Sequence, residues 1–503
     1  MKKFALGSVV LLFSPFAVQA QTVLPQAADP YFTAAQKQLQ EHLQQTPNTR
    51  VARNVILFVG DGMGIASVTA GRILEGQLRG VDGESNNLSF DRFPYVAFSK
   101  TYTHDAQVAD SAPTASAMMT GVKMRNDVIG LNADAKPSDC AGSKGKEVMS
   151  VAAMAEQAGR SVGVVTTARL THATPAAVYA HTPFRDWESD GDMKKADLDA
   201  GCKDIASQLI AWPHGDGIEV ALGGGRDRFL PKTETDPEGR PFKKPREDGR
   251  NLTQEWLTRY SNSGAYVWNR QQFDAIDPKV TQHLLGLFEV DHMQYEVDRV
   301  KSTPSEPSLA EMTTKAIDML SSNPNGYFLM VEGGRIDHGH HSGNAYRALH
   351  EVVALDAAVK MALSKVDLNE TLIIVTADHS HVFTIAGYPK RNNPIFETVV
   401  DENGKLTTAK DGRPYTTLGY MNGPGAVEQG RPHPAPLPPS HPDYKQQALV
   451  PLESETHGGE DVGIYAAGPW AHLFSGVVEQ NYIYHVIDHA TGWSQKPGSR
   501  KTP

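Results

Sequence analysis

Residues 332–341 read Glu-Gly-Gly-Arg-Ile-Asp-His-Gly-His-His and gather two carboxyl groups, one guanidinium and three imidazoles. They directly follow residues 326–331, an apolar run typical of a buried strand. Imidazoles and carboxylates are common ligands of zinc and other divalent metals. The glycines end the strand and a helical pattern begins near Ser342, so Asp337 and His341 lie one turn apart and face the same way. The segment predicts part of a metal site; the alternative is a solvated polar loop.

Further metal-binding side chains lie next to other apolar, strand-like runs. They are Asp61 after residues 54–59, Asp378 and His379 after residues 371–376, and His457 shortly before residues 462–467. A single Asp or His is more often a capping or core residue than a ligand. Because the carboxyl ends of parallel strands meet at one edge of a sheet, the repeated placement favours a shared site.

Ser111 opens a second segment of interest, residues 110–119, which reads Asp-Ser-Ala-Pro-Thr-Ala-Ser-Ala-Met-Met. Pro113 fits the first turn of a helix, where its missing N–H is not needed. The simplest local interpretation is that Ser111 is an ordinary N-cap. Beside a divalent cation, however, the metal and the helix dipole would both favour the ionised hydroxyl and make it a nucleophile.

The order of elements predicts an α/β fold with a central, mostly parallel sheet flanked by helices on both faces. Short apolar runs alternate with helical patterns, at residues 54–59, 161–166, 218–222, 327–331, 371–376 and 462–467. We expect a catalytic core over residues 51–387 that is completed by residues 455–503. Residues 388–454 are rich in Pro, Gly and Asn, which indicates an inserted subdomain rather than sheet.

The N-terminus predicts an exported protein. Residues 1–20 combine two lysines, an apolar stretch and Val18-Gln-Ala20, the pattern of a signal peptide. No other apolar stretch approaches the roughly 20 residues that cross a bilayer, so we expect no transmembrane segment and a periplasmic or secreted protein. Residues 21–50 form an N-terminal arm that is polar and helix-prone at 30–46. A formal charge of -10 without a basic run argues against nucleic acid as a partner.

Cys140 and Cys202 are the two cysteines of the chain. In an exported protein the simplest expectation is a disulfide between them. Two buried thiols or a zinc ligand are the alternatives, and the absence of a CxxC pair argues against a redox motif.

Five motifs, in this order along the chain, resemble those of alkaline phosphatases, which are phosphoric monoester hydrolases. They are Val-Gly-Asp61-Gly-Met-Gly, Asp110-Ser111-Ala, Glu332-Gly-Gly-Arg-Ile-Asp337-His-Gly-His-His341, Thr-Ala-Asp378-His379-Ser-His and Thr-His457-Gly-Gly-Glu-Asp. The resemblance spans about residues 50–475. It implies hydrolysis of phosphate monoesters to inorganic phosphate, with a broad range of leaving groups, at two zinc ions and one magnesium ion around a phosphorylated serine.

The resemblance also implies the role of each site residue. The first zinc would be held by Asp337, His341 and His457. The second would be held by Asp61, Asp378 and His379, with Ser111 as the nucleophile in contact with it. Magnesium would take Asp61, Glu332 and Thr174. Arg185, in Phe-Arg185-Asp-Trp, matches the arginine that clamps the phosphate.

Further positions resemble the animal enzymes and some marine bacterial ones. His172 and His338 stand where many bacterial relatives carry Asp and Lys, and would act through water near the magnesium and the phosphate. The cysteines match a disulfide of the animal enzymes, and residues 388–454 match their crown insertion. An additional calcium site would use Glu238, Phe288, Glu289 and Glu306. A homodimer is implied, with the N-terminal arm reaching the partner.

Two other functions compete with this one. A sulfatase or phosphodiesterase could use the same metal scaffold, but Ser111-Ala-Pro-Thr-Ala115 lacks the Arg of the sulfatase motif, and a diesterase would normally lack the third metal site. A non-catalytic binder of metal or phosphate would give Ser111 no task.

Overall fold

The computed structural model describes residues 24–301, 306–428, 430 and 437–494, in two compact units, 1–46 and 47–503. In the first unit α1 (Pro30–Leu43) begins at Asp29, whose carboxylate accepts from the backbone N–H groups of Tyr31 and Phe32. None of its side chains is buried. The helix expected within the N-terminal arm is therefore confirmed, whereas the predicted signal peptide, residues 1–20, lies outside the described residues.

The second unit is built on a ten-stranded sheet with the order β15-β2-β14-β8-β1-β7-β3-β4-β6-β5. Its strands are β1 (Asn54–Gly60), β2 (Tyr95–Lys100), β3 (Ser161–Arg169), β4 (Val220–Gly224), β5 (Gly264–Val267), β6 (His283–Leu287), β7 (Tyr327–Gly333), β8 (Thr371–Ala377), β14 (Val462–Ala467) and β15 (Gly476–Glu479). Within this sheet only β14 runs antiparallel to its neighbours, β2 and β8. The predicted, mostly parallel sheet is confirmed.

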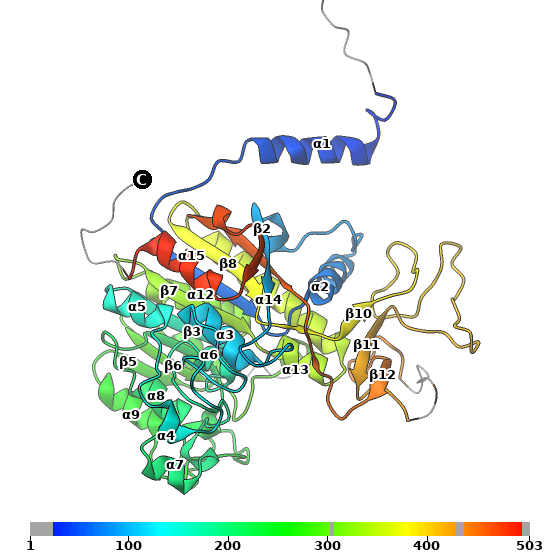
Figure 1. The fold of residues 1–503 in the computed structure, drawn as a ribbon. Coiled ribbons are helices and arrows are strands. Elements are labelled where there is room, and N and C mark those ends of the chain that lie inside the picture. Colours follow the sequence, from blue (N-terminus) through cyan, green and yellow to red (C-terminus); the bar gives the residue numbers. More distant parts are fainter. Residues whose placement is uncertain (1–23, 302–305, 429, 431–436, 495–503) are drawn as a thin grey trace, which may run out of the picture. The chain divides into compact units, whose positions relative to one another are not determined.

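Helices cover both faces of this sheet, as Figure 1 shows. Along β1, Val55, Leu57 and Val59 belong to one hydrophobic cluster while Ile56 and Phe58 belong to another, as expected from side chains that alternate across a strand. The first cluster includes residues of α3 (Ser111–Thr120), α5 (Val151–Gln157) and α15 (Tyr482–Thr491), and the second includes residues of α2 (Ile65–Leu78), α12 (Leu309–Leu320) and α14 (Ala345–Lys365). Burial on both faces explains why the central strands are almost uninterruptedly apolar.

Shorter helices lie between the main elements. They are α4 (Cys140–Ser143), α6 (Ala173–Ala176), α7 (Lys195–Asp199), α8 (Ile205–Ile210), α9 (Leu252–Arg259), α10 (Arg270–Ala275), α11 (Glu296–Arg299) and α13 (Arg335–His341). The start of α13 corrects one expectation, because this helix begins at Arg335 and not near Ser342. Asp337 and His341 are nonetheless one turn apart, since both lie within α13. Across the described residues, no helix is long and apolar enough to cross a membrane.

The segment 388–454 contains strands, contrary to expectation. Its strands β11 (Leu418–Gly423) and β12 (Ala448–Pro451) join β10 (Phe383–Ile385) in a separate three-stranded sheet. β9 (Ser380–His381), which precedes this segment in the sequence, pairs with β13 (His457–Gly458), which follows it. The strands are short and lie far apart in the sequence, so composition obscured them.

The expected disulfide is present between Cys140 and Cys202, which are 62 residues apart. It ties α4 to the chain after α7, beside a small cluster formed with Trp187 and Met193. The two alternatives, buried free thiols and a zinc ligand, are therefore wrong.

We predict that Cys140→Ser with Cys202→Ser lowers the free energy of unfolding by about 4 kcal/mol, the chain-entropy value for a loop of this length. Denaturant unfolding of the oxidised wild type and of the double variant measures the difference. The reduced wild type serves as a control and should match the variant. Equal stability of all three forms would show that the bridge does not constrain the unfolded chain.

Candidate metal and phosphate site

Three predicted ligands lie at the carboxyl ends of three adjacent strands. Asp61 directly follows β1, Asp378 directly follows β8, and Glu332 lies in the last part of β7. Because β1 lies between β7 and β8 and pairs with both in parallel, these ends share one edge of the sheet. All three carboxyl groups are fully buried. The structure thus brings together residues that are more than three hundred positions apart in the sequence.

Several buried oxygen atoms at this edge lack a hydrogen-bond partner among the described residues. They are Asp61 Oδ2, Asp378 Oδ2, Glu332 Oε1 and Thr174 Oγ1, the last from α6. Burial and the neighbouring carboxylates raise the pKa of Asp61 well above its usual value, and burial raises the pKa of Glu332 to about 8. Buried acids without donors are costly, so this oxygen-rich pocket has the chemistry of a cation site.

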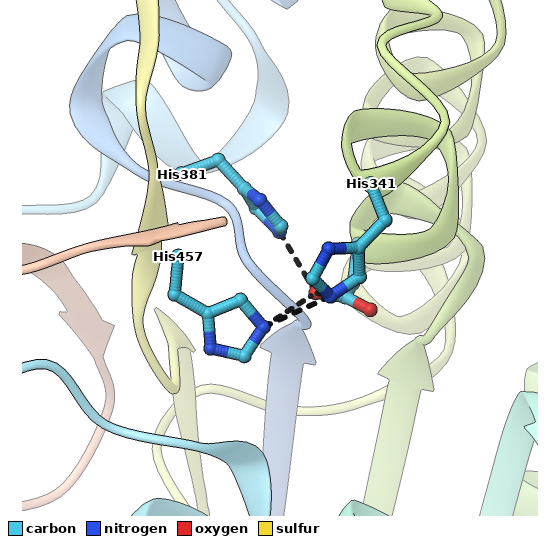
Figure 2. A group of neighbouring side chains, drawn as sticks. His341, His381 and His457 are labelled. Atoms are coloured by element: carbon cyan, nitrogen blue, oxygen red, sulfur yellow. Dashed lines mark hydrogen bonds and ion pairs between the residues drawn. The ribbon is translucent and has the colours of Figure 1, made fainter. Parts of the chain in front are cut away.

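The three residues predicted for the first zinc converge, as Figure 2 shows for the histidines. His341 directs Nδ1 to the carbonyl of Glu455 at 2.6 Å, and His457 directs Nδ1 to the carbonyl of Ala109 at 2.7 Å. Their Nε2 atoms lie 3.0 Å apart and within 3.4 Å of Asp337 Oδ1. A carbonyl fixes the N–H on Nδ1, which leaves the Nε2 lone pairs facing one another beside a carboxylate. This arrangement suits a zinc ion.

His381 joins this group, although we did not predict a role for it. Its Nε2 lies 2.8 Å from Asp337 Oδ1, and its Nδ1 contacts the carboxylate of Glu455. Burial opposes the charged imidazole, but the two carboxylates outweigh it and raise the pKa of His381 to about 9. Because both ring nitrogens are engaged, His381 acts on the site through Asp337. One signal in the sequence could have indicated His381, because it lies two residues after the predicted ligand His379. Its contact with Glu455, 74 positions away, could not be read from the sequence.

The second predicted zinc set is equally compact. His379 Nε2 lies 3.4 Å from Asp61 Oδ1, 3.3 Å from Asp378 Oδ2 and 3.0 Å from Ser111 Oγ, while its Nδ1 faces the carbonyl of Ser380. Burial lowers the pKa of His379 well below its usual value, so the imidazole is neutral and has a lone pair for a metal.

Ser111 is not the N-cap of its helix. Asp110 takes that position and accepts a hydrogen bond from the backbone N–H of Ala112 at 2.7 Å. Ser111 is instead the first residue of α3, and its hydroxyl points to His379 and Asp61. The capping interpretation of Ser111 is therefore wrong, and its buried hydroxyl lies at the positive end of the helix dipole.

Arg185 is positioned by His172, an expected site residue, and by Asp110, to which no role was assigned. Its Nη1 donates to Asp110 Oδ1 at 3.0 Å, and its Nη2 lies 3.1 Å from His172 Nε2. His172 also comes close to Asp61 and Glu332, and its buried Nδ1 has no partner among the described residues. The guanidinium thus lies between α3, the helix of Ser111, and the oxygen-rich pocket, where it could bind a phosphate group.

His338 lies beside His172, with ring centroids 5.4 Å apart, and its Nδ1 accepts a hydrogen bond from Arg335 at 2.9 Å. His292, which the sequence did not indicate, packs against both rings. Burial lowers the pKa of all three imidazoles well below the usual value. Because these three rings are neutral, the positive charge of this region comes from the neighbouring arginines.

His340, to which the sequence assigned no role, faces away from the zinc sets. Its Nε2 lies 2.8 Å from Ser67 Oγ in α2, and its Nδ1 lies 2.8 Å from the hydroxyl of Tyr420 in β11. This fully buried ring therefore links α13 to α2 and to the separate three-stranded sheet.

Among the described residues, the acids predicted for calcium do not form a cluster with ligand oxygens all within 4.8 Å of one another. Arg240 contacts Glu289 and lies 3.8 Å from Glu238, which also pairs with Arg226. Glu306 accepts from the backbone N–H of Gln294, keeps a buried Oε2 without a partner, and has its pKa raised by burial to about 8. Phe288 lies beside them in sequence. Guanidinium groups thus pair with two of the three carboxylates, and the calcium site stays a prediction.

Comparisons with known proteins agree with this geometry. The family model described as alkaline phosphatase matches residues 52–493. The tissue-nonspecific alkaline phosphatase of Felis catus is 47% identical over 497 residues, covering 95% of this chain and 93% of that one. An alkaline phosphatase of Gadus morhua is 48% identical over 463 residues, covering 91% and 95%.

Two solved structures share the fold. An alkaline phosphatase of Thermus thermophilus has a TM-score of 0.63 at 23% identity and covers 90% of this chain and 93% of its own. That of the Antarctic bacterium TAB5 has a TM-score of 0.60 at 23% identity, covering 89% and 100%. With the family model spanning nearly the whole chain and animal relatives close to half identical, this chain belongs to the alkaline phosphatase family.

Proposed function

We propose that this enzyme hydrolyses phosphate monoesters through a phosphoserine at Ser111, with two zinc ions and one magnesium ion. The observation that carries the proposal is the common orientation of three imidazoles. His341, His379 and His457 each turn Nδ1 to a backbone carbonyl and Nε2 inward, toward buried carboxylates. Nitrogen and carboxylate donors so arranged are typical of zinc.

The first zinc would be held by Asp337, His341 and His457, and the second by Asp61, Asp378 and His379. Magnesium would take Asp61, Glu332 and Thr174, because each of these has a buried oxygen without a hydrogen-bond partner and magnesium prefers oxygen ligands. Asp61 would belong to both sets. When bound, the metals supply charge that favours the ionised serine, stabilises the departing oxygen and activates water.

The chain's own residues then define the reaction. Ser111 Oγ attacks phosphorus, an oxygen–phosphorus bond forms, and the bond to the leaving alcohol breaks. Water later attacks the phosphoserine and releases inorganic phosphate. Arg185, oriented by Asp110 and His172, would pair two phosphoryl oxygens, and the planar fork of an arginine suits this geometry.

The natural consequence is a broad range of leaving groups, because the strong interactions all involve the phosphoryl group.

We also propose that the chain is exported to the periplasm or secreted and that it forms a homodimer, as the N-terminal pattern and the family suggest. The exposed helix α1, with no buried side chain, is available for contact with a partner.

Removal of the nucleophile separates catalysis from binding. We predict that Ser111→Ala reduces monoester turnover about 10³-fold or more and abolishes the acid-stable phosphoenzyme, while zinc and magnesium contents stay unchanged. Ser364→Ala, on the exposed face of α14, is the control and should behave as wild type. Phosphoenzyme formation with labelled phosphate, and rates on a monoester and a diester with the same leaving group, provide the readouts. Full activity of Ser111→Ala, or faster diester cleavage, would refute the proposal.

His172 should influence the metal requirement more than the substrate range. In His172→Asp a carboxylate would face the oxygen-rich pocket of Asp61 and Glu332, so we predict that half-maximal activation needs about tenfold less magnesium. Relative rates on a panel of monoesters should stay the same. The exposed His485→Asp is the control for a new surface charge. An unchanged magnesium titration would show that His172 does not act near this ion.

His381 should hold the first zinc site in shape. We predict that His381→Ala weakens zinc binding about 10- to 100-fold, because Asp337 loses its orienting partner. His381→Gln keeps an N–H near the position of Nε2 and should restore part of the affinity. Zinc stoichiometry by mass spectrometry and turnover against free zinc measure both effects. Equal zinc affinity in the wild type and in His381→Ala would show that Asp337 does not need this partner.

A further inference from the structure

A second group of carboxyl side chains lies at the opposite end of the strands. Glu156 is near the end of α5, Glu219 directly precedes β4, and Asp216 lies in the turn before it. Oxygen atoms of the three side chains lie within 4.8 Å of one another. The amino ends of parallel strands face away from their carboxyl ends, so this group is separate from the zinc and magnesium residues.

Glu156 is the most constrained member of this acidic group. Its side chain is only 6% exposed, and its Oε1 is buried without a hydrogen-bond partner among the described residues. Burial and the neighbouring Glu219 and Asp216 raise the pKa of Glu156 to about 10. A buried carboxyl next to two others is strongly unfavourable when ionised, unless a cation compensates it.

No lysine or arginine in the described parts of the chain provides that compensation. Among the described residues, His283 Nε2 lies 3.8 Å from Asp216 Oδ2, but burial lowers the pKa of this imidazole and so disfavours its charged form. Arg160 is nearby but directs Nη1 to the carbonyl of Ala158. Glu219 accepts from the backbone N–H of Val162 in β3 at 2.7 Å, which fixes its carboxylate without balancing its charge.

The surroundings provide both space and access. The three acids line a cavity of about 400 Å³, together with Arg160 and His283. The backbone of Gly215 closes over Glu156, since a Cβ there would lie 1.9 Å from Glu156 Oε2 and the residue has a positive φ of 53°. Asp216 is exposed and gives an ion a way in from solvent. The result is a small, oxygen-lined pocket with one buried and one open side.

We propose that Glu156, Asp216 and Glu219 bind a calcium ion that stabilises the amino ends of β3 and β4. Carboxylates alone select hard cations, and calcium accepts the irregular, partly hydrated coordination that one exposed and two buried acids offer. Magnesium demands a stricter octahedral geometry and suits this site less. The expected affinity is that of extracellular calcium modules, with a Kd of about 0.1–1 mM.

Calcium titration of the zinc- and magnesium-loaded enzyme tests the proposal. At fixed zinc and magnesium, we expect 10 mM calcium to raise the Tm of the wild type by about 2 °C or more, with one fewer calcium bound per chain in Glu156→Gln. Without calcium, Glu156→Gln should be about as stable as the wild type, because a carboxyl whose pKa is raised to about 10 is already neutral there near neutral pH. Asp216→Asn changes only an exposed side chain and should weaken calcium binding at least tenfold.

Glu238→Gln is the matched control, because it removes an acid from the other predicted calcium set and should leave calcium binding by Glu156, Asp216 and Glu219 intact. Turnover on a monoester should stay within twofold of wild type in all variants. The proposal is overturned if Glu156→Gln and Asp216→Asn keep the full calcium response, if Glu238→Gln alone removes it, or if magnesium at equal concentration produces the same stabilisation.

Discussion

The mutual repulsion of buried carboxyl groups at the carboxyl ends of β1, β7 and β8 is the constraint on which this structure depends. Asp61, Glu332 and Asp378 are held together by the parallel register of three central strands, and one oxygen of each lacks a hydrogen-bond partner among the described residues. Hydrophobic clusters on both faces of the sheet keep the strands in place despite this repulsion. The fold therefore maintains a strongly electronegative pocket that becomes favourable only when cations occupy it.

A layer of hydrogen bonds around this pocket fixes the direction of each metal-binding group. Backbone carbonyls orient the three zinc-facing imidazoles, the Glu455 and His381 pair orients Asp337, and Asp110 both caps α3 and holds Arg185. The carbonyls of Glu455 and Ala109 come from segments just before β13 and α3, and that of Ser380 from the short strand β9, so elements outside the main sheet also fix the geometry of the site. Electrostatic attraction between the carboxylates and cations would fill the site, and these hydrogen bonds give the site its geometry.

Sequence reasoning predicted the central strands and the ligands that follow them, because apolar runs and clustered polar residues are local signals. It did not predict β2, whose exposed and buried residues alternate, or the short strands β5, β6 and β15. It also left His381 without a role, because that role depends on Glu455 from beyond the inserted segment. Such pairings are set by tertiary packing. The salt bridges of Arg240 with two predicted calcium ligands were invisible for the same reason.

The segment from Asp378 to His381 contributes to both proposed zinc positions within four consecutive residues. Asp378 and His379 face the second zinc set, while His381 supports Asp337 of the first. The spacing between the two positions is thus set by covalent geometry rather than by packing. We expect related chains to vary freely in length between residues 388 and 454 but to allow no insertion or deletion here, since a single added residue would place one set of ligands out of phase with the other.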